Sequence, residues 1–127
     1  MSDYQEIILE YTFNTSPKVL YYRLSNPSGL AEWFADDVNI SDNIFTFIWD
    51  GSEEQAELIS KKENVYIRFK WLEEGKENTF LEFRIVVHEL TGDVALLVTD
   101  YVEEDEKEDT IELWNTQVGN LKHSLGL

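Results

Sequence analysis

Between residues 37 and 102 the chain is a series of short segments that alternate apolar and polar side chains and are separated by turn signals. A period of two is typical of a strand with one buried face. Turns such as Asp50-Gly51 are too short to hold a crossover helix, so consecutive strands must pair as hairpins. The pattern therefore predicts an antiparallel meander. With a first strand before it, the predicted strands cover residues 7–13, 38–40, 44–49, 53–62, 65–71, 81–87 and 94–101.

Two short helices are predicted after the first strand. Ser16 is a favourable N-cap and Pro17 suits the first helical position, where a missing N–H costs nothing. Asn26 and Pro27 repeat this signal. We expect one helix to run to about Leu24, and a second to end near residues 33–34.

The last part of the chain predicts one long amphipathic helix. Ile111, Trp114, Val118, Leu121 and Leu125 are spaced three, four, three and four residues apart, which gives a single apolar stripe. The acidic run 103–109 precedes them. It would serve either as an acidic docking segment or as the start of this helix, whose dipole favours negative charge. We favour the second interpretation. Gly119 would weaken the helix, or allow it to approach the sheet closely.

These elements predict an α+β fold in one domain, residues 1–127. A curved antiparallel sheet of about six or seven strands has one apolar face to cover, and only the C-terminal helix is long enough to cover it. A bent sheet around a helix favours an internal cavity between them. The side chains expected to point inward are Phe69, Trp71, Leu81, Phe83, Ile85, Leu96, Val98, Trp114, Val118 and Leu121.

Charge and composition exclude several classes of function. The net charge is −16, from 26 acidic and 10 basic residues, so we expect repulsion from nucleic acids and anionic lipids. The chain has no cysteine, which excludes disulfides and a thiol nucleophile. The N-terminus lacks a signal-peptide pattern, and no apolar stretch approaches the roughly 20 residues of a membrane span. We expect a cytoplasmic protein without membrane insertion.

Few residues indicate chemistry. His88 and His123 lie on different predicted elements, so a zinc site is not expected, and no glycine-rich phosphate loop is present. We therefore expect no metal and no cofactor. Acid–base candidates are Asp100, with Tyr11, Arg84 and His88. Parity places Asp100 on the inward side of its strand, but the rarity of unpaired buried carboxylates favours a position at the rim, in water.

Aromatic residues are abundant, with four Trp, six Tyr and seven Phe. They would either line a ligand pocket or pack together as an ordinary core. The cavity candidates for ligand binding are Trp33, Phe34, Trp49, Phe69, Trp71, Phe83, Ile85, Leu96, Val98, Asp100, Trp114, Val118 and Leu121.

Residues 19–34, VLYYRLSNPSGLAEWF, resemble the early helix pair of the START-like, helix-grip (Bet v 1-like) superfamily. The similarity is greatest to the branch related to the activator of Hsp90 ATPase, in which a helix runs into a Ser/Thr-Asn/Asp-Pro corner followed by Leu and a Trp-aromatic pair. Leu113-Trp114 and Leu121-Lys122 resemble the last helix of that branch. One departure is Asp42-Asn43, which stands where a glycine-rich connection is usual.

The resemblance implies the helix-grip fold and several functions. Members bind lipids, hormones or polyketides in the cavity, act as cyclases or hydroxylases, or assist a chaperone. Three hypotheses follow: a non-catalytic domain that binds a small hydrophobic molecule, a protein-interaction module, and a cyclase-type enzyme. The first is preferred, because no nucleophile–base pair is visible. The sequence does not decide the oligomeric state.

Overall fold

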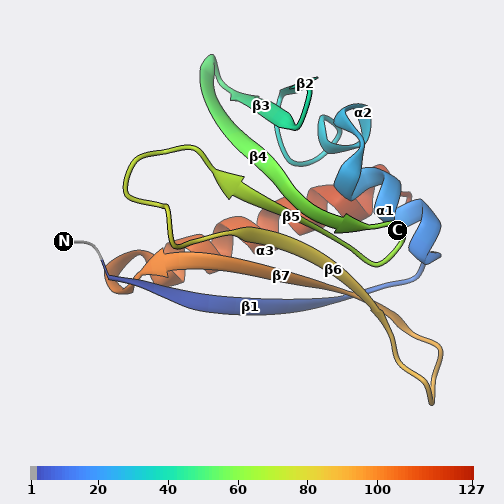
Figure 1. Ribbon diagram of the computed structural model, residues 1–127. Coiled ribbons are helices and arrows are strands. Elements are labelled where there is room, and N and C mark those ends of the chain that lie inside the picture. Colours follow the sequence, from blue (N-terminus) through green and yellow to red (C-terminus); the bar gives the residue numbers. More distant parts are fainter. Residues whose placement is uncertain (1–2) are drawn as a thin grey trace.

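A computed structural model describes residues 3–127 and contains one seven-stranded antiparallel sheet. Figure 1 shows the elements in their chain order. They are β1 (Tyr4–Phe13), α1 (Pro17–Ser25), α2 (Pro27–Leu30), β2 (Asp37–Ser41), β3 (Ile44–Trp49), β4 (Ser52–Lys62), β5 (Tyr66–Trp71), β6 (Leu81–Val87), β7 (Val94–Glu103), the 3₁₀ turn η1 (Glu104–Glu106) and α3 (Lys107–Ser124).

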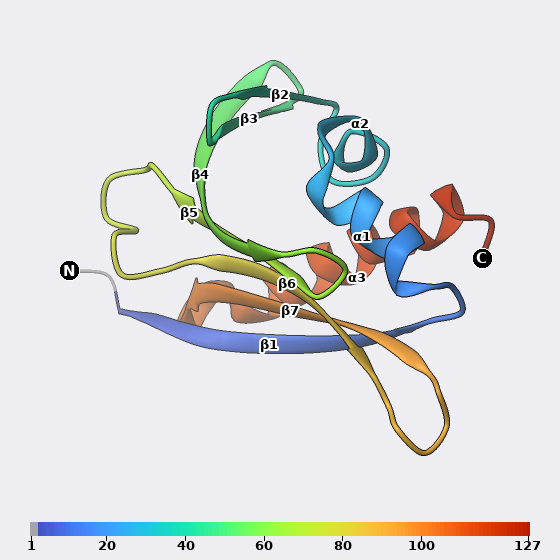
Figure 2. The same cartoon turned by 45° about the vertical axis from the view of Figure 1, so that its right-hand side comes forward.

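The sheet has the strand order β1-β7-β6-β5-β4-β3-β2. From β2 to β7 each strand pairs with its neighbour in sequence, so this part is the predicted meander. β1 closes the sheet by pairing with β7. Figures 1 and 2 show the strands curving around α3, with α1 and α2 at one end. The predicted α+β architecture is confirmed.

A β-bulge in β4 contributes to the curvature. The register with β5 shifts between Leu58 and Ser60. An extra residue in one strand bends that strand and increases its local twist. The bulge therefore helps the β2–β4 part of the sheet to turn toward the helical side.

α3 covers the apolar face of the sheet as predicted. Trp114, Val118 and Leu121 are buried, and the outer members of the stripe are half-buried. The acidic run forms η1 and the first turn of α3, where the helix dipole favours negative charge. Gly119 does not permit a close approach, because a Cβ added there would have no atom within 4 Å.

The core between sheet and helix is largely aromatic. The Phe34 ring lies 5.1 Å from Phe47, 5.3 Å from Trp49 and 5.8 Å from Trp114, measured between ring centroids. Phe83 meets the same group edge-on, 5.9 Å from Trp114. Such offset and edge-to-face pairs add roughly 0.5–1.5 kcal/mol each beyond the burial of their area. The rings thus hold the helices and the sheet together.

The helical corner follows its capping signals at the start but ends early. The Ser16 side chain accepts a hydrogen bond from the Val19 N–H, and the Asn26 side chain accepts one from the Ser28 N–H. α2 ends at Leu30, before the predicted residues 33–34. In a helix, the side chains of consecutive residues point in different directions. Turns follow α2 instead, and they allow both Trp33 and Phe34 to be buried.

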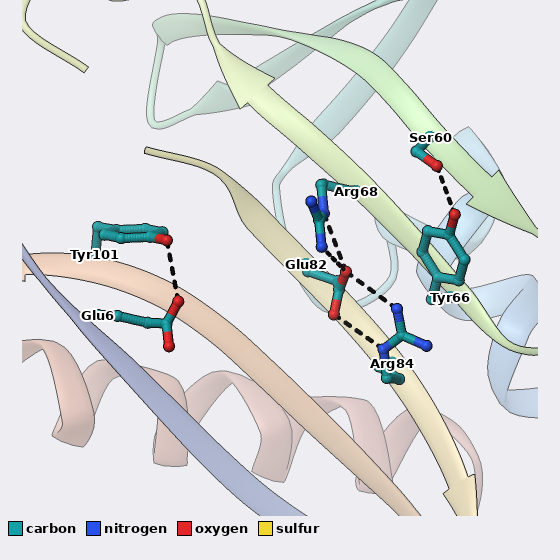
Figure 3. A network of polar contacts seen from close by, with 7 residues as sticks. All are labelled: Glu6, Ser60, Tyr66, Arg68, Glu82, Arg84 and Tyr101. Carbon is teal, nitrogen blue, oxygen red and sulfur yellow. Dashed lines mark hydrogen bonds and ion pairs between the residues drawn. The ribbon is translucent and has the colours of Figure 1, made fainter. Parts of the chain in front are cut away.

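The convex face of the sheet carries a polar network centred on Glu82 (Figure 3). Arg68 Nη2 lies 2.8 Å from Glu82 Oε1, and Arg84 Nε lies 3.1 Å from Oε2. The two guanidinium groups also cover aromatic rings, Arg68 over Phe80 and Arg84 over Tyr66. Burial alone would raise the pKa of Glu82, but the hydrogen bonds from both arginines outweigh it and lower the pKa.

Candidate functional site

A cleft of about 480 Å³ lies between the sheet and α3. Its walls come from β3, β4 and β5 on one side, and from the end of β7 and the first half of α3 on the other. The apolar lining residues are Phe34, Trp49, Trp71, Leu81, Val102, Leu113 and Trp114. The polar ones are Tyr4, Ser52, Glu54, Lys76, Asp100, Tyr101, Glu106, Thr110 and Gln117.

Four rings, those of Phe34, Trp49, Trp71 and Trp114, form a wall of the cleft, and hydrogen bonds between different elements fix Trp49 and Trp114. Trp49 Nε1 donates to the backbone carbonyl of Phe34 at 2.6 Å, which ties the end of β3 to the turn after α2. Trp71, at the end of β5, lies 6.4 Å from Trp49 between ring centroids. Trp114 comes from the buried stripe of α3 and stacks on Phe34. Since each ring stands on a different element, the wall depends on the tertiary fold.

Asp100 brings a carboxyl group into this aromatic surrounding. Its Oδ2 accepts a hydrogen bond from Trp114 Nε1 at 2.9 Å, and its Oδ1 accepts one from the Tyr101 backbone N–H at 2.8 Å. Burial raises the pKa of Asp100, although these hydrogen bonds and the charge of Lys76 oppose the rise. Asp100 thus points inward, as strand parity predicted, and not into water at the rim. The indole donor makes this placement favourable.

Lys76 is the cation that lines the cleft. Its Nζ lies 2.9 Å from Glu73 Oε2 and 5.8 Å from the centroid of the Trp71 ring. Burial would lower the pKa of Lys76, but the hydrogen bond and charge of Glu73 outweigh it and the pKa is raised. Lys76 stands in the loop between β5 and β6, where no periodicity indicates the direction of a side chain. Sequence reasoning therefore missed it.

The structure divides the predicted ligand-binding residues into two groups. Five line the cleft: Phe34, Trp49, Trp71, Asp100 and Trp114. The others are buried in the core and do not line it: Trp33, Phe69, Phe83, Ile85, Leu96, Val98, Val118 and Leu121. Period-two and helical patterns identify side chains that point inward. They do not distinguish side chains that line a cleft from side chains that pack against one another in the core.

The other acid–base candidates do not join Asp100. Tyr11 donates to the Asn115 side chain on α3 at 2.7 Å, outside the cleft lining. Arg84 belongs to the convex network, and His88 is half exposed, 3.4 Å from Glu10. Residues 3–127 contain no group of three or more His, Asp or Glu side chains placed to hold a metal ion.

None of the helices within residues 3–127 has the length and apolar character needed to cross a membrane.

Solved structures of similar shape cover nearly the whole chain. BfR322 from Bacteroides fragilis has 39% sequence identity and a TM-score of 0.68, over 100% of this chain and 94% of its own. The Aha1 dimer from Colwellia psychrerythraea has 18% identity and a TM-score of 0.71, over 95% and 92%. MLL2253 from Mesorhizobium loti has 13% identity and a TM-score of 0.77, over 96% and 97%. No curated protein matches the chain in sequence.

The family assignment rests on sequence as well as on shape. The model of the START-like superfamily domain matches residues 1–127. The match includes residues 19–34 and the last helix, which are the parts that carried the resemblance. The chain belongs to the START-like superfamily.

Proposed function

We propose that this protein is a non-catalytic START-like domain that binds a small hydrophobic molecule in the cleft between the sheet and α3. The observation that supports it is the wall of four rings around a volume of about 480 Å³. Small-molecule sites commonly have volumes of roughly 300–1,000 Å³, with mostly apolar walls and a few polar groups that orient the ligand. The volume of the cleft lies in this range, and seven of its sixteen lining residues are apolar, including the four rings.

Binding is favoured over catalysis by the polar groups at the cleft. A cyclase-type or hydrolytic mechanism needs an acid and a base that converge on one point. Asp100 is held by Trp114 and by a backbone N–H, and Lys76 is paired with Glu73. The lining does contain hydroxyl groups, on Tyr4, Ser52, Tyr101 and Thr110. Within residues 3–127, however, the hydrogen bonds of the Asp100 carboxyl group and the ion pair of Lys76 go to other groups.

The proposal predicts saturable binding that is lost when the cleft is filled. Decanol, a neutral and simple apolar probe, should bind with one-to-one stoichiometry, quench or shift tryptophan fluorescence, and raise the Tm. At a concentration 100-fold above Kd, mass action adds about 2.7 kcal/mol to the free energy of unfolding. Leu113 is 57% exposed and lines the cleft, so Leu113→Trp should fold normally and block the site.

A matched control is Leu90→Gln. Leu90 is fully exposed at the tip of the β6–β7 hairpin and does not line the cleft, so this variant should bind as the parent does. Native mass spectrometry of the purified protein gives an independent measurement, since a co-purified apolar molecule should be present in the parent and absent from Leu113→Trp. Equal binding by parent and Leu113→Trp, or no response to apolar probes, would remove the proposal.

A further inference from the structure

We propose that the molecule bound in the cleft is an amphipathic organic cation, such as an alkyl amine or alkyl quaternary ammonium, and not a fatty acid. This inference rests on the proposed function and names the class of ligand. Three features of the cleft support it: the sign of its charges, the position of Lys76 over an aromatic ring, and the unused acceptor capacity of Asp100.

The charged groups of the cleft are mostly negative. Asp100 is half-buried in it, and Glu54 and Glu106 line it as exposed residues. Lys76 opposes them, but its ammonium group is already paired with Glu73 at 2.9 Å. A ligand carboxylate would meet three carboxyl groups and would have to break the Lys76–Glu73 pair. A ligand ammonium group would meet the same carboxyl groups as attractive partners.

The aromatic wall already holds a cation. Lys76 Nζ lies 5.8 Å from the centroid of Trp71, within the distance of about 6 Å at which an aromatic face attracts an ammonium group. Trp49 and Trp71 are half-buried, so parts of both rings remain available in the cleft. The Lys76 ammonium group therefore competes with a cationic head group for the face of Trp71. If Lys76 were displaced, the head group of a ligand would contact that ring.

Asp100 retains acceptor capacity for such a head group. A carboxylate has about four lone-pair sites, and Asp100 uses one on each oxygen, for Trp114 and for the Tyr101 backbone. The remaining lone pairs would accept N–H donors of an amine or lie beside a quaternary ammonium group. The net charge of −16 also attracts cations from solution toward an acidic cleft.

Isothermal titration with three probes of equal chain length tests the inference: decyltrimethylammonium, decanol and decanoate, each below its micelle concentration. We expect decyltrimethylammonium to bind one to one, about tenfold more tightly than decanoate, which corresponds to the contribution of a partly desolvated cation–aromatic contact. Lys76→Met should tighten binding of the cation severalfold, because it removes a like charge. Lys62→Met is the matched control, since Lys62 is exposed and does not line the cleft.

The outcomes separate the inference from the proposed function. If decanoate binds as tightly as the cation, the cleft does not prefer a cationic head group. If Lys76→Met weakens binding of decanoate and leaves binding of the cation unchanged, Lys76 serves an anionic ligand. In either case the inference fails while the proposed function stands. If Leu113→Trp, which keeps the net charge, binds the cation as the parent does, the cation adsorbs to the acidic surface and the inference fails. If none of the three probes binds, the proposed function fails with it.

Discussion

Glu82 shows how one residue can depend on two neighbours. Among residues 3–127, Glu82 is the one charged residue that is buried. The other buried polar residues there are Thr79 and Thr99. A buried carboxylate is costly unless it is paired and hydrogen-bonded. Arg68 and Arg84 provide these contacts from the two sides (Figure 3). Each guanidinium group also lies over an aromatic ring.

Glu82→Gln should lower the free energy of unfolding at neutral pH by about 2 kcal/mol, because it leaves two arginines beside a neutral amide. The pKa of Glu82 is lowered in the folded state, so its contribution is present above the unfolded pKa and is lost as pH falls through the folded pKa. The difference between parent and variant, measured by urea denaturation, should therefore shrink in acid. Glu53→Gln, at an exposed position of β4, is the control. A difference that stays constant down to acid pH would show that shape, and not charge, is responsible.

At the residue scale, the sequence correctly predicted side-chain directions that depend on one strand alone. It failed where the environment of a side chain depends on a contact with a distant segment. Strand parity placed Asp100 inward, because Leu96 and Val98 lie on the same face of β7. The hydrogen bond that makes this position favourable comes from Trp114, fourteen residues later. Nothing in the local pattern of β7 indicates an indole donor, so the preference for a rim position was reasonable and wrong.

At the scale of elements, periodicity and capping predicted most of the fold. The strands over residues 44–49 and 81–87 and the start of the first helix at Pro17 agree with the structure, and the other strands differ by a few residues at one or both ends. The largest boundary error among helices is the end of α2, where burial of the Trp33–Phe34 pair replaces helix by turns. Local signals mark where an element begins, and the packing of large rings decides where this one ends.

The packing of α2 against α1 should depend on Gly29. A Cβ at Gly29 would meet backbone atoms of α1, including the Cα of Arg23 at 2.9 Å, and a backbone does not move aside as a flexible side chain does. Gly29→Ala should therefore lower the free energy of unfolding by about 1–3 kcal/mol. Gly119→Ala is the opposite case, because α3 leaves open space there and alanine favours the helix by up to about 1 kcal/mol. Thermal unfolding of both variants measures this contrast, and two equal and small shifts would contradict it.

For the molecule as a whole, sequence predicted the curved sheet and the covering helix but not the extent of the cleft. The meander has one apolar face, and the C-terminal helix has one apolar stripe. Packing the helix on the sheet is one of few arrangements that bury both surfaces. The cleft is lined by Trp49, Trp71 and Trp114 from three different elements, and by Lys76 from an irregular loop. The extent of the cleft depends on the relative positions of four elements. A sequence pattern within one element carries no information about those positions.

The net charge of −16 should make stability depend on salt. Within residues 3–127, ion pairs engage only four acidic side chains, Glu10, Glu32, Glu73 and Glu82, so most of the negative charge there is not balanced by an ion pair. The Debye length falls from about 30 Å at 0.01 M to about 3 Å at 1 M ionic strength, which screens this repulsion. The Tm should therefore rise by several degrees between these concentrations of NaCl, since about 1 kcal/mol corresponds to roughly 4 °C for a chain of this size.

A variant with less negative charge gives the matching control for that experiment. Glu53 and Glu89 are exposed, and neither lines the cleft. Glu53→Lys together with Glu89→Lys removes two negative charges and adds two positive ones, so repulsion is weaker from the start. Its Tm should exceed that of the parent at 0.01 M NaCl and should change less with added salt. If the parent instead loses stability as salt increases, the few ion pairs contribute more than the repulsion among the remaining carboxylates.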